Sequence, residues 1–190
     1  MFLESTINEQ TSFGSVKILC GAMFSGKKEE LIRRLKHAEI TKQNILIFKP
    51  QIDVRYDENS VVSHDKNCMP STAVHPSKVV LIQSENAQVV AIDETQFFDD
   101  DLPIICSDLA KKGKRIIVAG LSMDYTGKPF GPVPKLFATE DFVTKLRSIC
   151  THCGNTAICS KRKTVDTNIV QVGKKEECEP LCSACFNTSL

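Results

Sequence analysis

Short apolar runs separated by longer mixed stretches fill the first two thirds of the chain. The runs at residues 16–20, 45–48, 89–92 and 115–121 are mostly apolar, and a further run lies at residues 79–82. Continuous apolar character over so few residues is typical of strands that are buried on both faces of a parallel sheet.

Two of the mixed stretches, residues 27–41 and 99–112, carry the periodicity of amphipathic helices. In each, apolar side chains return every three or four residues, which places them on one helix face. The recurring residues are Leu31, Leu35 and Ala38 in the first stretch and Leu102, Ile105 and Leu109 in the second. Strand and helix in alternation predict an α/β fold, with helices on both faces of a parallel sheet.

Two segments interrupt this alternation and are predicted to be loops. Residues 51–78 are polar, with scattered Asn, Asp, Ser, His and Pro, and have room for one short strand at Val61 and Val62. Residues 127–134 read GKPFGPVP, in which glycine and proline break any regular element.

The pattern changes again at Cys150, where cysteines become frequent. Six of the nine cysteines lie in the last 41 residues, and they include two C-x-x-C pairs, Cys150 with Cys153 and Cys182 with Cys185. Two such pairs complete a tetrahedral four-cysteine zinc site with no open position, which makes the site structural. The odd cysteine count argues against a full disulfide framework. Four free or redox-active thiols are the alternative.

The remaining cysteines and the nearby histidine have simpler interpretations. Cys20, Cys68 and Cys106 are predicted to be small core or loop residues. His152 lies inside the first cysteine pair, where a bystander is commoner than a ligand.

A phosphate-binding motif, G-x-x-x-x-G-K, follows the first apolar run directly. It comprises Gly21, Ala22, Met23, Phe24, Ser25, Gly26 and Lys27, and it opens the first predicted helix. Glycines let backbone N–H groups point at phosphate oxygens, the helix N-terminus adds partial positive charge, and Lys27 would reach the β- and γ-phosphates. A glycine-rich turn without a ligand is the alternative, but the position between strand and helix favours phosphate binding.

The next residue, Lys28, departs from this motif. Ser or Thr is expected there, because its hydroxyl binds Mg²⁺. An ammonium group cannot bind a cation and would repel one. Lys28 therefore weighs against ordinary Mg·ATP chemistry.

An acidic pair, Asp93 and Glu94, ends the apolar run 89–92. In phosphate-loop proteins an Asp at the carboxyl end of a neighbouring strand holds Mg²⁺, usually through water. The adjacent Glu can take a proton from an attacking hydroxyl group. We predict Asp93 as the metal-side residue and Glu94 as the general base, against the alternative of a solvated helix start.

Length and charge limit the remaining possibilities. The 190 residues suit one core of ordinary size with a small appendage, so we expect a phosphate-loop nucleotide-binding domain at residues 1–149 and a zinc-binding domain at residues 150–190. The net charge of +1 gives no strong attraction to nucleic acid or membranes. No apolar run approaches a membrane span of roughly 20 residues, and the N-terminal segment MFLESTINEQTSFGS lacks signal-peptide features. We expect a cytoplasmic protein.

Together these segments resemble the tetrameric, zinc-containing type of thymidine kinase. The resemblance runs from about Phe13 to Phe186 and rests on CGAMFSGKKEELIRRL, IFKPQIDVRY, VVSHD, AIDETQFFDD, VAGLSMDYTGKPFG and the two C-x-x-C pairs. It implies a RecA-like P-loop domain and a small zinc-ribbon-like domain, whose insert forms a lasso loop over the nucleoside. The implied reaction is phosphorylation of the 5′-hydroxyl of thymidine by ATP, with structural Zn²⁺, with Mg²⁺ accompanying ATP, and in a homotetramer.

The resemblance also implies roles for individual residues. Glu94 would be the catalytic base. The ATP-binding residues would be Gly21, Ala22, Met23, Phe24, Ser25, Gly26, Lys27, Lys28, Asp93, Glu94, Thr95 and Gln96. The nucleoside-binding residues would be Met23, Arg55, Phe97, Leu121, Tyr125, Phe130, Val170, Val172 and Cys178, with Arg55 also on the phosphate side. Aromatic walls suit base stacking, and backbone groups of the lasso suit reading of the base edge.

Three positions differ from the family pattern. Lys28 replaces Ser or Thr, Ser122 stands where an Asp usually follows Gly-Leu, and Cys178 stands where a Tyr is expected over the nucleoside. These differences motivate a second hypothesis, a kinase-like protein that binds nucleotide or nucleoside without efficient turnover. A third hypothesis is a DNA-binding P-loop ATPase that uses the basic run at residues 161–163, although the overall charge balance disfavours it.

Overall fold

One parallel sheet of six strands dominates the computed structural model, which describes residues 13–53, 60–62, 68–163 and 178–189. The strand order is β5-β2-β6-β7-β1-β8, and every neighbouring pair is parallel. The strands are β1 (Ser15–Gly21), β2 (Ile45–Pro50), β5 (Thr72–Val74), β6 (Val89–Ile92), β7 (Arg115–Gly120) and β8 (Phe142–Leu146). The four runs predicted as buried strands form the centre of this sheet.

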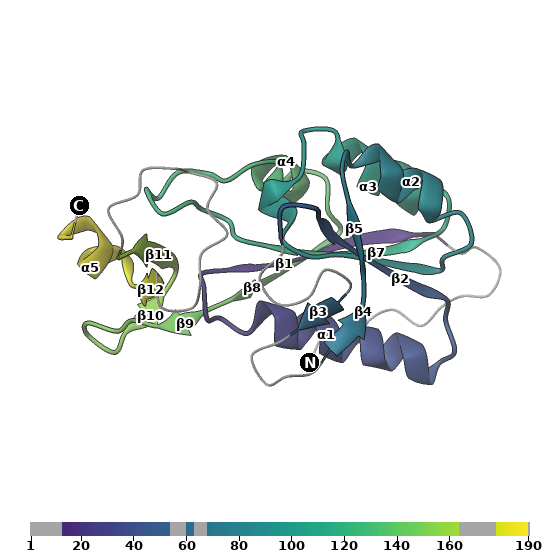
Figure 1. Cartoon of the computed structure of the whole chain (residues 1–190). Coiled ribbons are helices and arrows are strands. Elements are labelled where there is room, and N and C mark those ends of the chain that lie inside the picture. Colours follow the sequence, from purple (N-terminus) through teal and green to yellow (C-terminus); the bar gives the residue numbers. More distant parts are fainter. Residues whose placement is uncertain (1–12, 54–59, 63–67, 164–177, 190) are drawn as a thin grey trace.

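Helices cover both faces of the sheet, which confirms the predicted α/β class (Figure 1). α1 (Lys27–Ile40) lies on one face, and α2 (Lys78–Gln83), α3 (Leu102–Lys111) and α4 (Val133–Phe137) lie on the other. Successive strand residues point to opposite faces. Ile18 therefore packs in the core on the α3 side, whereas Leu19 packs in the core beneath α1. Both cores are apolar, so the central strands require apolar residues throughout.

The cysteine-rich segment forms short antiparallel strands beside the main sheet. β9 (Ser148–Ile149) pairs with β10 (Thr156–Ala157), β11 (Cys159–Arg162) pairs with β12 (Cys178–Leu181), and α5 (Ser183–Asn187) follows. Ala157, Leu181 and Phe186 belong to a third apolar cluster, separate from the two cores of the main sheet. A separate core agrees with a division near Ile149, although the boundary itself stays a prediction.

The loop predictions were incomplete. Residues 51–78 contain not only the expected short strand but a hairpin of β3 (Ser60–Val62) with β4 (Cys68–Pro70), followed by β5. The loop predicted at residues 127–134 ends in α4, which begins at Val133. Strands β3, β4 and β5 are each three residues long, which is too short to give a clear apolar run in the sequence.

The apolar run at residues 79–82 belongs to helix α2 rather than to a strand. Val80 is fully buried, whereas Ile82 is 74% exposed, and such one-sided burial is typical of a helix lying on a sheet. The second predicted helix, α3, begins at Leu102, with Pro103 in the first turn where a missing N–H is tolerated. Among the described residues, no helix combines the length and apolar character that a membrane span needs.

Candidate active site

The phosphate loop connects β1 to α1 at the carboxyl edge of the sheet, as predicted. Gly21 must be a glycine, because a Cβ atom there would lie 2.3 Å from the carbonyl oxygen of Leu146 and 2.6 Å from the hydroxyl of Ser25. Gly26 adopts a φ of 81°, a left-handed conformation that glycine tolerates, immediately before the helix begins. These two glycines set the bend that brings the loop back onto the helix N-terminus.

Two hydroxyl groups of the cysteine-rich segment hold the phosphate loop from outside. The backbone N–H of Met23 donates to Oγ of Ser160 over 2.8 Å, and Oγ of Ser148 donates to the carbonyl of Phe24 over 3.1 Å. Neither serine belongs to a recognisable motif, and the sequence interpretation missed both. The conformation of the loop is therefore linked to the cysteine-rich segment.

Lys27 lies folded back into the loop. Its ammonium donates to the carbonyl of Ala22 over 2.6 Å and to Oγ of Ser25 over 3.4 Å. Burial lowers the pKa of Lys27 to about 8, while the nearby carboxylates of Glu94 and Asp93 act in the opposite direction. Lys27, which is predicted to contact phosphate, thus lies buried inside the loop, where its charge partly balances those of Glu94 and Asp93.

The ammonium group of Lys28 lies among three carboxylates. Its Nζ is 3.0 Å from Oε1 of Glu94, 3.2 Å from Oδ2 of Asp93 and 3.9 Å from Oδ2 of Asp53. Asp93 and Glu94 follow β6, and Asp53 follows β2, the strand next to β6. The sequence interpretation missed Asp53. Its position just beyond an apolar strand was the available signal.

Asp93 is held by charge more than by hydrogen bonds. Burial raises its pKa above the usual value, while the ammonium group of Lys28 acts in the opposite direction. Its Oδ2 atom is buried and accepts no hydrogen bond of good geometry, although it lies in the ion pair with Lys28. The residues present therefore do not fit a Mg²⁺ ion bound by the protein: the expected hydroxyl is absent, and an ammonium lies against the expected carboxylate.

Glu94 is positioned by the residues that follow it. It adopts a left-handed conformation, with φ 50° and ψ 43°, and begins the short 3-10 helix η1 (Thr95–Phe97). Nε2 of Gln96 donates to Oε2 of Glu94 over 2.6 Å, and Oε1 of Gln96 accepts from the N–H of Leu121 over 3.0 Å. Gln96 thereby links the predicted base to the end of β7.

Thr95 makes a second link between the same two strands. Its hydroxyl, which is buried, donates to the carbonyl of Ala119 over 3.1 Å. Gly120 leaves room for it, because a Cβ atom there would lie 2.2 Å from Oγ1 of Thr95. Both Thr95 and Gln96 are buried and connect the ends of β6 and β7.

Several aromatic residues predicted to bind nucleoside lie on the segments that follow β6 and β7. The rings of Phe97 and Phe130 meet edge to face, with centroids 5.5 Å apart. The guanidinium of Arg162 lies over the ring of Tyr125, 4.1 Å from its centroid. Leu121 is joined to this group through Gln96. The predicted residues Arg55, Val170 and Val172 lie outside the described residues.

The segment from Ser122 to Phe130 is more ordered than its glycines and proline suggest. Oδ1 of Asp124 accepts hydrogen bonds from the N–H and hydroxyl of Thr126 and from the N–H of Lys128. The carbonyl of Ser122 accepts from the N–H of Phe130. A buried Asp124 thus shapes the turn that presents Tyr125.

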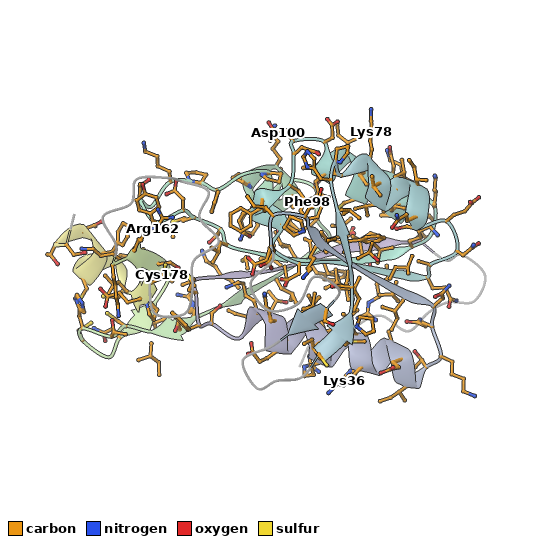
Figure 2. The ribbon with its side chains drawn as sticks, viewed as in Figure 1. Lys36, Lys78, Phe98, Asp100, Arg162 and Cys178 are labelled. Carbon is orange, nitrogen blue, oxygen red and sulfur yellow. The ribbon has the colours of Figure 1, made fainter. Side chains whose placement is uncertain are left out.

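Cys178 lies one strand away from this aromatic group. It opens β12, where it pairs with Arg162 of β11, the residue that stacks on Tyr125 (Figure 2). Two members of the basic run at residues 161–163 are thus engaged within the chain, because Lys161 also donates to the carbonyl of Ser189.

The four cysteines of the predicted zinc site lie together. The sulfur atoms of Cys150, Cys153, Cys182 and Cys185 are all within 4.8 Å of one another, and those of Cys153 and Cys182 are 3.6 Å apart. Tetrahedral Zn²⁺ with Zn–S bonds of about 2.3 Å places its sulfur ligands roughly 3.8 Å apart, so this group fits zinc. His152 is outside the cluster and lies 3.5 Å from Glu179.

The other predicted cysteine environments also agree with the structure. Cys20 and Cys106 are buried, and Cys68 is exposed. Burial raises the pKa of Cys106 to about 12, so its thiol stays protonated in the core and has no role in the chemistry of the site.

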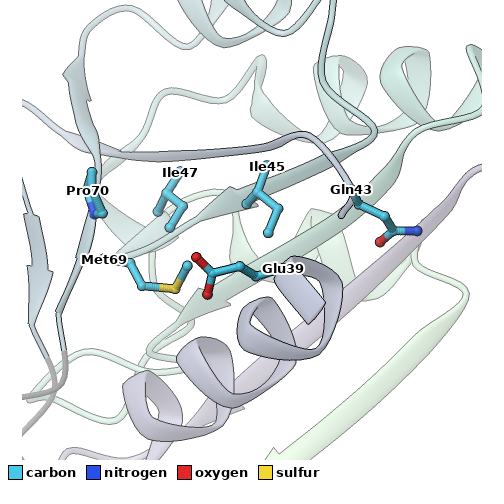
Figure 3. A pocket seen from close by; sticks show the side chains of 6 residues that line it. All are labelled: Glu39, Gln43, Ile45, Ile47, Met69 and Pro70. Carbon is cyan, nitrogen blue, oxygen red and sulfur yellow. The ribbon is translucent and has the colours of Figure 1, made fainter. Parts of the chain in front are cut away.

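A hollow of about 280 Å³ lies elsewhere, along the second half of α1 (Figure 3). Its lining consists of Glu39, Gln43, Ile45, Ile47, Met69 and Pro70. These residues come from the end of α1, the turn that follows it, β2 and β4, at the opposite end of α1 from the phosphate loop. The hollow is therefore separate from the predicted active site.

Comparisons with known proteins agree with the motifs. The family model described as thymidine kinase matches residues 14–186. The thymidine kinase of Bacteroides thetaiotaomicron is 47% identical over 186 residues, which cover 98% of this chain and 94% of that protein. The enzyme of Porphyromonas gingivalis strain W83 is 49% identical over 173 residues, covering 91% and 85%. That of a Rhodothermus species is 47% identical over 175 residues, covering 92% and 82%.

Among solved structures, the ATPase DotB of Legionella pneumophila superposes with a TM-score of 0.47 and 9% identity, over 76% of this chain and 43% of that one. This likeness is too distant to carry an argument. The family model and the relatives, in contrast, span nearly the whole chain. The matched residues 14–186 take in the phosphate loop, the acidic pair and both cysteine pairs, and the chain belongs to the thymidine kinase family.

Proposed function

We propose that this chain transfers the γ-phosphoryl group of ATP to the 5′-hydroxyl of thymidine. The observation that carries the proposal, beside family membership, is the placement of Glu94. Its carboxylate stands at the end of β6, next to the phosphate loop, and is oriented by a 2.6 Å hydrogen bond from Gln96. A carboxylate in that position can accept a proton from a hydroxyl group that attacks the bound nucleotide.

The phosphate loop is the proposed ATP site. Backbone N–H groups of the phosphate loop, apart from that of Met23, which donates to Ser160, would bind the phosphate oxygens together with the N-terminus of α1. Lys27 would exchange its 2.6 Å hydrogen bond to Ala22 for the β- and γ-phosphates, whose charge attracts an ammonium group more strongly than a carbonyl does. Thr95 and Gln96 would act by holding the ends of β6 and β7 together.

The chemical step is a displacement at phosphorus. The 5′-oxygen of thymidine forms a bond to the γ-phosphorus, the bond from that phosphorus to the β,γ-bridging oxygen breaks, and ADP leaves with the bonding electrons. Glu94 takes the hydroxyl proton. Such a transition state needs positioning and charge stabilisation more than covalent help, so the rigid support of Glu94 by Gln96 and Leu121 is important.

The nucleoside would bind beside this centre. We propose that Phe97, Phe130 and Tyr125 supply the aromatic walls, with Met23 and Leu121 beside them. Cys178 is too small to stack on a base, so Tyr125, backed by the guanidinium of Arg162 at 4.1 Å, would take a larger share of that contact. The predicted contributions of Arg55, Val170 and Val172 remain predictions.

Zinc would be held by the four clustered cysteines and would supply only structural stabilisation, because no ligand position stays open. Ser148 and Ser160 extend from the strands next to this cluster to the phosphate loop. A folded zinc region would therefore help to keep the loop in shape. The homotetramer implied by the resemblance and the cytoplasmic location expected from the N-terminal segment remain predictions. Light scattering on purified protein would test the first.

The hypothesis of a binding protein without turnover is not favoured. Glu94 is present, oriented and within the family pattern. The DNA-binding hypothesis also loses support, since Lys161 and Arg162 have partners within the chain.

A coupled assay of ADP release tests the proposal. Purified, zinc-loaded protein with ATP should release ADP on addition of thymidine, and more slowly with the other natural deoxynucleosides. A rate of ADP release that does not change with any nucleoside would indicate an ATPase. No ADP release at all would indicate a binding protein without turnover. Either result would overturn the proposal.

A further inference from the structure

The ammonium group of Lys28 occupies the place in which kinases with the usual motif bring a hydroxyl group to a metal ion. Lys28 stands in the first turn of α1, and its Nζ lies 3.0 Å from Glu94 and 3.2 Å from Asp93. Asp53 completes the group at 3.9 Å. The side chain therefore acts as a cation shared by carboxylates from two adjacent strands.

Burial makes this arrangement hard to open. The side-chain exposure is 17% for Lys28, 12% for Glu94, 6% for Asp53 and 4% for Asp93. Removing the ammonium would leave three poorly solvated carboxylates facing one another, which is unfavourable without another cation. A divalent ion could enter this position only by displacing Lys28, because like charges at such short separation repel strongly.

Lys27 does not fill this role. Its ammonium is bound to the carbonyl of Ala22 and the hydroxyl of Ser25, inside the loop, where phosphate oxygens would arrive. The two lysines thus differ in their contacts. Lys27 contacts the phosphate loop and attracts Asp93 and Glu94 from a longer distance, whereas Lys28 contacts the carboxylates directly.

We propose that Lys28 is the resident cation of the Asp53–Asp93–Glu94 cluster and takes the place of a metal ion bound by the protein, so that ATP binding depends little on Mg²⁺. Any Mg²⁺ that arrives with ATP is then held by the phosphates and water alone. The protein gains no extra affinity for the metal-bound nucleotide. This inference deepens the proposed function, on which it rests for the identity of ATP as the ligand.

Calorimetry with ATP tests the inference in three proteins. The wild type is compared with Lys28→Thr, which restores a hydroxyl, and with Lys36→Thr, which removes an exposed lysine from the outer surface of the same helix (Figure 2). Each is titrated with ATP in EDTA and in excess MgCl₂. The wild type and Lys36→Thr should bind ATP with dissociation constants that differ by less than about tenfold between the two conditions.

For Lys28→Thr, the ratio of dissociation constants in EDTA and in MgCl₂ should be at least about tenfold larger than in the wild type. The buried carboxylates then lack their cation and require Mg²⁺ in its place. A wild-type ratio above tenfold, or a Lys28→Thr ratio equal to that of the wild type, would overturn the inference.

A second measurement needs no variant and so does not depend on how Lys28→Thr folds. Mn²⁺ is titrated into the wild-type complex with ATP and into ATP alone, and free Mn²⁺ is followed by electron paramagnetic resonance. Reciprocal linkage requires the protein to change the affinity of ATP for Mn²⁺ by the same factor as Mn²⁺ changes the affinity for ATP. Less than about tenfold tightening is expected, and more would mean that protein groups reach the metal.

These binding measurements separate the two proposals. Weak metal dependence with no phosphorylation of thymidine would contradict the proposed function and leave the inference intact. Strong metal dependence together with phosphorylation of thymidine would contradict the inference about Lys28 and support the proposed function.

Discussion

Replacement of Glu94 by glutamine isolates the proposed general base. The amide has nearly the shape of the carboxylate, so the hydrogen bond from Nε2 of Gln96, now 2.6 Å long, keeps an oxygen acceptor. The left-handed backbone at φ 50° is also no harder for glutamine to adopt. Lys28 keeps Asp93 at 3.2 Å and Asp53 at 3.9 Å. The change therefore removes the ability to accept a proton and the carboxylate charge that lies 3.0 Å from the ammonium of Lys28, while the shape of the side chain is kept.

The magnitude follows from that loss. A positioned general base contributes about 100- to 10,000-fold to the rate, which corresponds to about 2.7 to 5.5 kcal/mol of barrier at 1.36 kcal/mol for each tenfold. The kcat for thymidine should fall by at least about 100-fold. ATP affinity should stay within about threefold or improve, because one negative charge leaves the phosphate site.

The assay combines steady-state kinetics with calorimetry on the same preparation. The matched control is Asp100→Asn, which removes an exposed carboxylate (Figure 2). The ion-pair partner of Asp100 is Lys135 of α4. That control should keep kcat within about twofold, since a surface ion pair contributes about 1 kcal/mol or less. A Glu94→Gln protein with kcat within about tenfold of the wild type would refute the assignment of the base.

Three further predictions concern the structure that supports the site. Cys182→Ser should abolish binding of about one Zn²⁺ per chain and lower activity by loosening the phosphate loop, measured by metal analysis and ADP release, whereas Cys68→Ser should change neither. Gly120→Ala should cost about 1–3 kcal/mol in denaturant unfolding, because its Cβ would lie 2.2 Å from Oγ1 of Thr95; an unchanged midpoint would contradict the tight packing. Glu30→Gln should destabilise the fold by about 0.5–1 kcal/mol at pH 7. Hydrogen bonds from Arg33 and Arg34 lower the pKa of Glu30 to about 2, so this stabilisation should be complete above about pH 4.5 and be lost as the pH falls through 2. A difference as large at pH 2 as at pH 7 would contradict it.

Local patterns predicted the elements that are defined by contiguous residues. The central strands, α1, the phosphate loop and the two C-x-x-C pairs each depend on spacing within a few residues, and each was found in place. The run at residues 79–82 was ambiguous because a short apolar run suits a strand or a buried helix face equally well. Only its packing against the sheet decides in favour of a helix.

The parts of the site that sequence reasoning missed depend on strand order. Asp53 and Asp93 are 40 residues apart, and they meet because β2 lies next to β6. Ser148 and Ser160 reach the phosphate loop only because the cysteine-rich segment folds back beside it. The position of Asp53 just beyond an apolar strand is too common a pattern to identify it as a site residue, and neither serine belongs to a motif.

Lys28 shows what the sequence can indicate and what only the structure can add. Its departure from the motif is visible in the sequence, where it suggests only repulsion of Mg²⁺. The structure adds the three carboxylates around its ammonium group, and these turn an apparent defect into a compensated charge.

Position-specific phosphoryl transfer tests the central claim most directly. Zinc-loaded protein is incubated with ATP labelled at the γ-phosphate and, separately, with thymidine, 3′-deoxythymidine and 5′-deoxythymidine. The proposed reaction predicts labelled monophosphate from thymidine and from 3′-deoxythymidine, and none from 5′-deoxythymidine, which lacks the attacking hydroxyl. Absence of label in thymidine, or equal labelling of 5′-deoxythymidine, would contradict the assignment of this chain as a thymidine 5′-kinase.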